Sequence, residues 1–419
     1  MKKLIYTSFS PNTRFKDLLL NIGILFTPWA WKSGSYHEKV EKIFTDRFPS
    51  SKAFTLNYAR SGMYVLFKSL GISNRSVMVQ GYTCVVAVSP VKGSGAEVVY
   101  VDIDPKTGNL SVEDLKRKIT NKTNVVMFQY TYGSSCGIEE VVKLCKEKNL
   151  FLVEDCTNTI FGKHKDKLIG SFGDASIFSF GRDKAVSGVD GGLILINNEK
   201  ILQSFMKEYD KLRYPSLSWI AHELTYPILW FLIKRLFNIK IGKLIHLIFT
   251  RLGILTKATS ESEKRCEVLE SSVCLMPNCL AHLAYNQLKD IDEINNHRKK
   301  IVEIYKNELN GIKRLDLFDY ENGNVLLRYS LKIKDERRNE LVEYMRKRSV
   351  YLGDWYTTPI APKEVDLNLA GYNPDVCSNS ELVCKEIVNL PTHINISEKD
   401  AEFIANSIKD FYADKENIK

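Results

Sequence analysis

The sequence has no CxxC pair among its nine cysteines, no long run of lysine or arginine, no internal repeat and no low-complexity tract. The scattered cysteines exclude a zinc ribbon and suit a reducing compartment, because several lie in apolar runs where a free thiol behaves as a small apolar residue. The net charge of +9 over 419 residues is not concentrated anywhere, so we do not expect a nucleic-acid surface. The start, Met1 to Tyr6, is followed by the polar stretch Ser8 to Arg14, which argues against a signal peptide.

The length of 419 residues exceeds one ordinary compact core, so we expect more than one domain. Between about Ala53 and Asn197, apolar β-rich runs alternate with amphipathic helical periods, such as a helix capped by Ser111. This alternation predicts an α/β fold with a large, mostly parallel sheet and helices on both faces. A smaller C-terminal α+β domain with one long helix over residues 282–309 is expected after it. The expected parts are an N-terminal apolar segment (1–34), a large cofactor-binding domain (35–213), a helical insert (214–256) and a small domain (257–419).

Residues 214–256 interrupt the α/β pattern with a stretch rich in Trp, Phe, Leu and Ile. Five basic residues stand there against one acidic residue, and the longest charge-free run, Leu224 to Ile233, has ten residues. A membrane-spanning helix needs about 20 residues. We therefore expect the insert to lie on an anionic bilayer rather than cross it, with tryptophans such as Trp230 as anchors and with Leu18 to Trp31 beside it. The alternative is that these helices pack over the core or in a subunit interface.

A carboxylate and a lysine follow two of the expected strands. The apolar run over residues 150–153 ends in Glu154-Asp155, and a later strand ends at Ser179 before a tight turn that carries Lys184. In such sheets ligands bind at the carboxyl ends of the strands, so both groups are expected in one cleft. Pyridoxal 5′-phosphate (PLP) chemistry needs this pair: a buried lysine with a lowered pKa attacks the aldehyde, and a carboxylate keeps the pyridine nitrogen protonated. The simpler alternatives are a surface lysine at position 184 and a helix N-cap at Asp155.

An ordered set of short motifs resembles the sugar aminotransferases of the DegT/DnrJ/EryC1/StrS family over roughly residues 35–200 and 270–410. The set comprises Ser61-Gly62, Tyr82-Thr83, Val101-Asp102-Ile103-Asp104, Tyr132-Gly133, Glu154-Asp155, Gly170-Ser171, Ser179-Phe180, Lys184, Gly191-Gly192 and Leu390-Pro391-Thr392-His393. The resemblance implies the PLP-transferase fold of type I and a homodimer in which each cofactor lies at the subunit boundary.

The resemblance also implies roles for individual residues. Lys184 matches the lysine that holds PLP as a Schiff base and moves protons, and Asp155 matches the partner of the pyridine nitrogen. The further cofactor contacts implied are Asn158 at the ring oxygen, Ser179, Ser61, Gly62 and Met63 at the phosphate, and Tyr82 against the ring. His393 and Arg213 are candidate substrate-binding residues, and no metal site is expected because the Cys and His residues show no metal-ligand spacing.

Four positions depart from the family pattern. They are Met63 in place of Thr, Cys84 in place of an aromatic residue, Asn158 in place of Gln, and Ser272 to Leu275 in place of the Asn and Arg offered to the neighbouring subunit. Because these changes remove contacts to the cofactor phosphate, we expect another cation, Arg213 or Arg265, to supply them.

The expected function is a PLP-dependent aminotransferase. An amino acid, with glutamate as the first candidate, donates its amine, and a nucleotide-linked keto sugar accepts it for a surface polysaccharide or glycolipid. Lys184 argues against the relatives that carry His at this position, which are dehydratases. The four departures motivate the alternative of a non-catalytic, membrane-associated scaffold or regulator with a PLP fold. We expect the protein in the cytoplasm, with peripheral contact to the inner face of the membrane.

Overall fold

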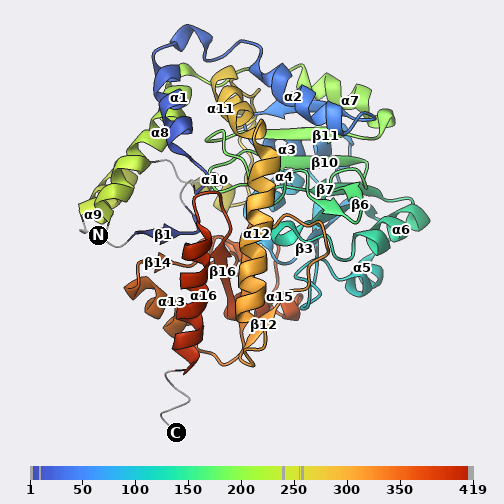
Figure 1. Ribbon diagram of the computed structural model, residues 1–419. Helices are drawn as coiled ribbons and strands as arrows, with labels where there is room; N and C mark the ends of the chain where they lie inside the picture. The colour runs from blue at the N-terminus through green and yellow to red at the C-terminus, as the bar shows by residue number, and fades with distance from the viewer. Residues whose placement is uncertain (1–2, 9–10, 238–240, 254, 256–258, 414–419) are drawn as a thin grey trace.

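Figure 1 shows the computed structural model of the chain, which describes residues 3–8, 11–237, 241–253, 255 and 259–413. A large sheet with helices on both faces lies beside a smaller antiparallel sheet that is covered by long helices. The predicted α/β class, with a mostly parallel large sheet and a smaller α+β part, is confirmed.

Seven strands form the large sheet, in the order β2-β11-β10-β7-β6-β3-β5. Their bounds are β2 Lys52–Leu56, β3 Ser76–Gln80, β5 Glu97–Val101, β6 Thr123–Gln129, β7 Phe151–Asp155, β10 Ala175–Ser179 and β11 Gly192–Ile196. The pairs from β10 to β5 are parallel, whereas β11 is antiparallel to both β10 and β2. A parallel return requires a long crossover, usually a helix, and the short connection between Ser179 and Gly192 contains none, so β11 runs back antiparallel.

Both faces of this sheet are apolar and both are covered. Val77 and Val79 of β3 belong to one core layer and Met78 to the opposite layer, because successive side chains of a strand point to opposite faces. Helices α3, α4 and α7 pack on the first layer, and α2, α5, α6 and α11 on the second. Their bounds are α2 Tyr36–Arg47, α3 Ala59–Ser69, α4 Val85–Gly93, α5 Val112–Lys118, α6 Ile138–Lys148, α7 Glu199–Tyr209 and α11 Asn278–Leu288. The predicted cap of α5 is confirmed, since the backbone N–H of Asp114 donates to Ser111 Oγ over 3.3 Å.

The smaller sheet has the order β12-β13-β16 and is antiparallel throughout. The bounds here are β12 Leu315–Leu317, β13 Arg328–Ile333, β16 Ile387–Pro391, α12 Ile291–Leu309, α13 Arg338–Lys347 and α16 Glu398–Ala413. The three helices bury their apolar sides against this sheet in a separate core. Short elements complete the chain: β1 Ile5–Tyr6, β4 Thr83–Cys84, β8 Lys163–His164, β9 Lys167–Leu168, β14 Val350–Tyr351, β15 Ile360–Ala361, α10 Glu261–Lys264, α14 Leu367–Ala370 and α15 Ser378–Glu386.

The prediction of one continuous helix over residues 282–309 is wrong. The chain forms α11 and α12, which are separated at Lys289 and Asp290. Asp290 has φ −102° and ψ 15°, outside the helical region, and its carboxylate forms ion pairs with Arg14 and Lys16. These two basic residues come from the N-terminal part of the chain, so the break depends on a contact that the local sequence does not reveal.

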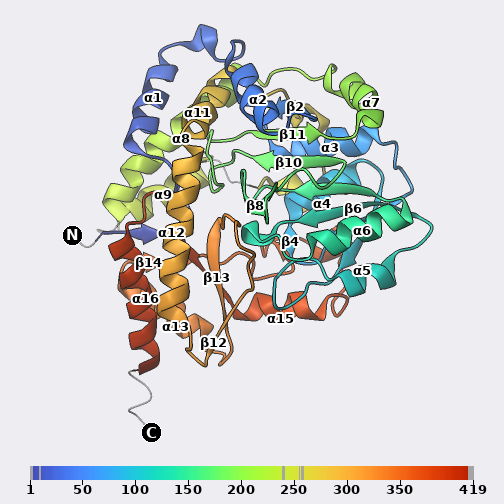
Figure 2. The same ribbon diagram turned by 45° about the vertical axis from the view of Figure 1, so that its right-hand side comes forward.

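Three helices, α1 (Phe15–Leu25), α8 (Leu217–Leu236) and α9 (Ile241–Arg251), lie together on the side of the molecule away from α5 and α6 (Figures 1 and 2). Among the described residues, none of the helices combines the length and apolarity that crossing a membrane requires. Trp230, expected as a bilayer anchor, is only 3% exposed, and this expectation is wrong because α8 turns that side toward the core. Positions 238–240, 254 and 256 of the predicted insert lie outside the described residues.

Candidate active site

The site begins where two neighbouring strands end. Ile177 of β10 pairs with Asp155, the last residue of β7, so the two strands end at the same edge of the sheet. After Ser179 the chain turns, and the backbone N–H of Lys184 donates to the carbonyl of Gly181 over 3.1 Å. The Lys184 amine then lies 3.1 Å from Asn158 Oδ1 and 3.4 Å from Thr157 Oγ1. The structure therefore places Lys184, Asp155 and Asn158 together, as the sequence predicted.

Burial sets the protonation of this pair. Asp155 is 3% exposed, and desolvation raises the pKa of its carboxyl group, while the nearby Lys184 charge opposes that rise. Desolvation likewise lowers the pKa of Lys184, against the pull of Asp155. A lowered pKa increases the neutral fraction of a lysine amine, and the neutral form is the one that acts as a nucleophile or accepts a proton.

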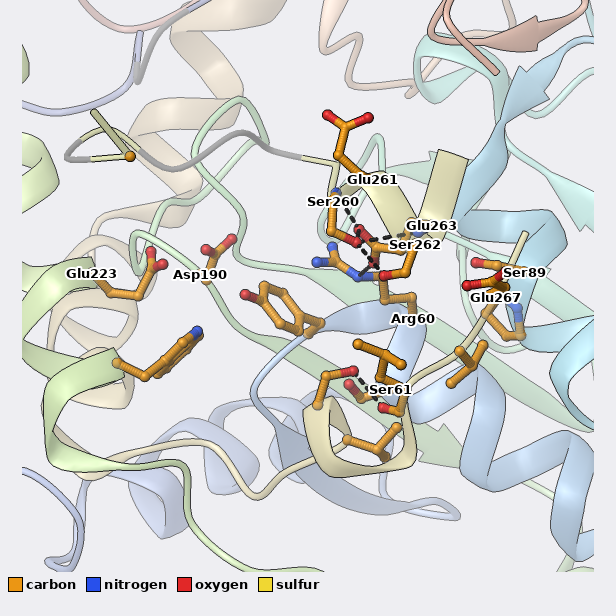
Figure 3. Close-up of a pocket in the computed structure, with 18 of the residues that line it drawn as sticks. Arg60, Ser61, Ser89, Asp190, Glu223, Ser260, Glu261, Ser262, Glu263 and Glu267 are labelled. Atoms are coloured by element: carbon orange, nitrogen blue, oxygen red, sulfur yellow. Dashed lines mark hydrogen bonds and ion pairs between the residues drawn. The ribbon is translucent and has the colours of Figure 1, made fainter. Parts of the chain in front are cut away.

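The pair opens into a cavity of about 760 Å³. Its lining comes from both parts of the chain, since Thr157 and Ser179 follow strands of the large sheet and Trp355 lies beside the smaller one. A second cavity, of about 460 Å³, adjoins it and shares Tyr58, Arg60 and Asp190 with it (Figure 3). A site between two structural parts is where small-molecule pockets are common.

Helix α3 begins earlier than the sequence suggested. Its first residue is Ala59 and its N-cap is Tyr58, which makes no side-chain cap, so Ser61-Gly62 does not open the helix. Ser61 donates its hydroxyl proton to Asn57 Oδ1 over 2.9 Å, and Gly62 contacts Leu56 and Ile194. Ala59, Arg60 and Ser61 form the first turn, and because Ala59 and Arg60 line the main cavity, free amides of this turn lie beside it, whereas the Gly62 N–H donates to the Tyr58 carbonyl. An uncapped helix N-terminus attracts an anion such as a phosphate.

The remaining predicted contacts divide into two groups. Ser179 and Met63 line the main cavity, whereas Tyr82, His393 and Arg213 are not among the described residues that line it. Tyr82 is fully buried, with its hydroxyl 2.6 Å from that of Tyr132.

His393 and Arg213 are held elsewhere. His393 Nε2 lies 2.8 Å from the Tyr6 carbonyl, and burial lowers the pKa of its imidazole to about 3. The Arg213 side chain is exposed. Arg265, the other cation considered for the phosphate, is also exposed and pairs with Glu267. Where these side chains lie depends on residues that are distant in the sequence, so the spacing of the motifs could not predict it.

Sequence reasoning missed a buried ionic cluster beside the lysine. Arg182 is 7% exposed, lies 2.5 Å from Glu223 of α8 and 3.5 Å from Asp190, and covers the Tyr226 ring at 3.7 Å. Asp190 and Glu223 face each other at one end of the second cavity (Figure 3). Burial and the neighbouring Glu223 charge raise the pKa of Asp190 well above its usual value. The only signal in the sequence was an arginine two residues before Lys184.

A second missed residue is Arg328, at the start of β13. It is 1% exposed, and its guanidinium stacks on the Trp355 indole with Cζ 3.6 Å from the ring centre. Its Nη2 donates to Ser8 Oγ over 3.2 Å, but within the described part of the chain Nη1 has no hydrogen-bond partner and no carboxylate forms an ion pair with the group. The Lys184 amine lies 5.1 Å from the centre of the same indole, so Arg328 is a buried cation close to the catalytic candidates.

The described residues contain no group of three or more His, Cys, Asp or Glu side chains that would hold a metal ion. A buried amine, a buried carboxylate and an uncapped helix end are the donor set that fits PLP, with its aldehyde, its pyridine nitrogen and its phosphate.

The model of the DegT/DnrJ/EryC1/StrS aminotransferase family matches residues 23–219 and 247–409. A GDP-perosamine synthase of Escherichia coli O157:H7 is 26% identical over 406 residues, which cover 93% of this chain and 94% of that protein. The spore coat polysaccharide biosynthesis protein SpsC of Bacillus subtilis is 23% identical over 394 residues, 91% of this chain and 90% of the relative.

Among solved structures, Helicobacter pylori PseC, an aminotransferase of pseudaminic acid biosynthesis, superposes with a TM-score of 0.76 at 17% identity, covering 98% of this chain and all of that one. At this identity the likeness establishes the fold alone, which is the type I fold of PLP sugar aminotransferases.

Proposed function

The chain belongs to the DegT/DnrJ/EryC1/StrS aminotransferase family, and on that premise we propose that it transfers an amino group from an amino acid to a nucleotide-linked keto sugar. The predicted class and cofactor are confirmed: the chain is an enzyme, a PLP-dependent sugar aminotransferase. The non-catalytic alternative is not supported. The observation that carries the proposal is the pair of partly buried Lys184 and buried Asp155 at one edge of the sheet, open to a large cavity.

The residues at this edge suit the cofactor. When bound, PLP supplies an aldehyde that captures amines and a protonated ring that withdraws electrons from the reacting carbon. Lys184 would hold the aldehyde, and Asp155 would hold the ring nitrogen in its protonated state. The backbone N–H of Thr157 donates to Asp155 Oδ1 over 3.0 Å, which orients the carboxylate. Ser179, with the first-turn amides of α3, would hold the phosphate.

Lys184 also carries the proton-transfer step. In the half-reaction with the donor, its neutral amine takes the proton from the α-carbon of the amino acid and returns it on the cofactor side. In the half-reaction with the sugar, the same amine moves the proton in the opposite direction. Asn158 accepts a hydrogen bond from this amine over 3.1 Å and thereby aims it into the cavity.

The acceptor is a keto sugar on a nucleotide, and the product enters a surface polysaccharide or a glycolipid. The support is the likeness to a GDP-perosamine synthase and to a spore coat polysaccharide protein over nine-tenths of the chain. The cavity of about 760 Å³ lies within the usual range for small-molecule sites of about 300–1,000 Å³.

For the donor, Arg328 supports an amino acid. Burial lowers the pKa of the Arg328 guanidinium although the charges of Asp183 and Asp354 oppose this shift, and a bound anion relieves the cost of burial. Arg328 and Lys184 lie against the same Trp355 indole, which lines the cavity. We infer that the carboxylate of the donor binds at Arg328 while its amine lies near Lys184.

Two further proposals concern partners. The chain forms a homodimer, which membership of the family suggests, and because Ser272 to Leu275 lacks the Asn and Arg usually offered to the neighbouring subunit, another segment of the partner supplies the polar contacts to the phosphate. It also contacts a membrane peripherally through residues 214–256, with the enzyme otherwise in the cytoplasm.

The direct test combines a spectrum with turnover. The purified protein loaded with PLP should lose its visible absorption band when glutamate is added and release 2-oxoglutarate in equal amount. Subsequent addition of keto sugars carrying GDP, UDP or TDP should restore the band with one of them. A protein that keeps its band with glutamate and with every other amino acid tried contradicts the proposal.

A further inference from the structure

Exposed apolar side chains are concentrated in two short segments of the chain. Of the 17 large hydrophobic side chains exposed among the described residues, 11 lie within residues 15–29 and 217–252. They are Phe15, Leu19, Phe26, Trp29, Leu217, Leu232, Ile241, Leu244, Leu247, Ile248 and Leu252. Trp29 is 78% exposed and Phe26 75%, values that a water-soluble surface rarely tolerates in such a group.

Eight of these residues belong to helices that pack on one another, while Phe26 and Trp29 follow α1 and Leu252 follows α9. Asn21 of α1 donates to the carbonyl of Leu224 in α8 over 2.6 Å, and the rings of Phe15 and Phe231 lie 6.3 Å apart. At the other end, Gly242 of α9 approaches the backbone of α8 so closely that a Cβ atom would lie 2.4 Å from the Ile233 carbonyl. Both views place α1, α8 and α9 along one side of the molecule (Figures 1 and 2). We call this side the α1-α8-α9 face.

The exposed charge on this face has one sign. The acidic residues of the two segments, Asp17 and Glu223, are buried and paired with Arg14 and Arg182. The exposed ionic side chains described there are Lys16, Arg235 and Arg251, all basic, and Lys16 is paired with Asp290. A second copy of the chain placed symmetrically on this face would bring like charges together, whereas an anionic surface complements them.

Part of this face lies outside the stretches that match the family model. The matched stretches end at residue 219 and resume at 247, so most of α8 and the first half of α9 fall between them. These parts of both helices therefore lie outside the stretches that the family model describes. With 11 residues, α9 is about 16 Å long, half the thickness of a bilayer core of about 30 Å.

We propose that the α1-α8-α9 face docks on an anionic lipid bilayer, with α1 and α9 lying in the interface and their apolar sides among the lipid chains. Exposed apolar helices, a tryptophan at the end of α1 and basic neighbours are the features of such interfacial helices. The basic side chains at the rim bind the anionic headgroups, each adding about 1 kcal/mol, or roughly fivefold in partitioning.

Helices α8 and α9, which carry the docking face, also form part of the active-site wall. Trp230 of α8 and His246 and Thr250 of α9 line the main cavity together with Lys184. The bilayer would therefore lie close to the opening through which the acceptor enters. On the proposed function, this position favours an acceptor or product handled at the membrane surface.

Vesicle flotation tests the docking. The PLP-loaded wild type should float with vesicles of phosphatidylcholine and phosphatidylglycerol, and less with phosphatidylcholine alone. The apolar variant Trp29→Ser/Leu244→Ser/Ile248→Ser should lose at least tenfold in partitioning. The charge variant Arg235→Glu/Arg251→Glu should lose more than tenfold on anionic vesicles only. Added salt should weaken flotation of the wild type but not of the charge variant, because salt screens exposed charges.

The matched control is Leu382→Ser/Phe403→Ser, which removes two side chains that are 47% and 44% exposed on α15 and α16. It should float like the wild type. An unchanged cofactor spectrum in each variant shows that the fold survives.

A wild type that stays at the bottom of the gradient with every lipid mixture overturns the proposal. The proposal is also overturned if the wild type binds no vesicle and the apolar substitutions convert the protein to a monomer in light scattering. The face is then a subunit interface. Flotation needs no turnover, so an inactive protein that floats would refute the proposed function and leave the docking intact.

Discussion

The cluster of Arg182, Glu223 and Asp190 predicts a specific pattern of stability changes. Two buried carboxyl groups share one buried guanidinium, with Glu223 at 2.5 Å and Asp190 at 3.5 Å. Burial and the neighbouring Glu223 charge raise the pKa of Asp190, which favours its neutral form beside Glu223. Either acid alone is able to neutralise Arg182.

We expect Asp190→Asn to cost less than about 1 kcal/mol in the free energy of unfolding, since Glu223 stays in place 2.5 Å from Arg182. Glu223→Gln should cost about 1.5 kcal/mol, because Asp190 at 3.5 Å remains as a carboxylate partner of Arg182. The double variant removes both carboxylates from the buried guanidinium and should cost about 3–5 kcal/mol. The double variant thus exceeds the sum of the single variants by at least about 0.5 kcal/mol, a coupling typical of residues in one network.

The pH dependence has a definite sign. Because the folded state raises the pKa of Asp190, this group contributes stability below its unfolded pKa of about 3.9, and that contribution is lost as the pH rises toward the folded value. Glu223→Gln removes one cause of the raised pKa, so this loss above about pH 4 should shrink. Urea unfolding followed by tryptophan fluorescence at several pH values measures both effects. If Glu223→Gln alone is as unstable as the double variant, Asp190 does not replace Glu223 and the reasoning is wrong.

Three further predictions concern the chemistry. Lys184→Ala should bind PLP without a covalent bond, so that borohydride reduction followed by mass spectrometry finds no modified peptide; trapping at another lysine would reject the assignment. Asp155→Asn should lower kcat about tenfold to a hundredfold, from the loss of one charge-assisted hydrogen bond of roughly 1.5–3 kcal/mol, with little change in melting temperature; full activity would remove Asp155 from the mechanism. Arg328→Gln should raise the KM for glutamate at least tenfold and leave the reaction of the aminated enzyme with the keto sugar unchanged, whereas Arg328→Lys should recover part of the loss. Equal effects on both half-reactions would show that Arg328 only supports the fold.

The local sequence pattern was enough to predict several helices and strands correctly. The strand over residues 150–153 and the strand that ends at Ser179 were expected at nearly the positions that the structure has, because short apolar runs between turns have few other ways to bury themselves. The same holds for the Ser111 cap, which needs only neighbours along the chain. Where a boundary depended on a distant contact, as at Asp290 or at the start of α3, the local pattern was misleading.

By itself, the sequence determined the sheet class, the cofactor and the Asp155–Lys184 pair. The sheet class follows from the alternation of strands and helices along the chain. The cofactor and the Asp155–Lys184 pair follow from short motifs at strand ends, which are local and recur across a family. Only the tertiary structure decided that Glu223 neutralises Arg182, that Arg328 and Trp355 reach the lysine from the second sheet, and that Trp230 points inward while Trp29 points out. The sequence of a helix that is apolar all round does not show which of its faces is buried. Which face is buried is settled by the elements that pack against it, and these come from parts of the chain hundreds of residues apart.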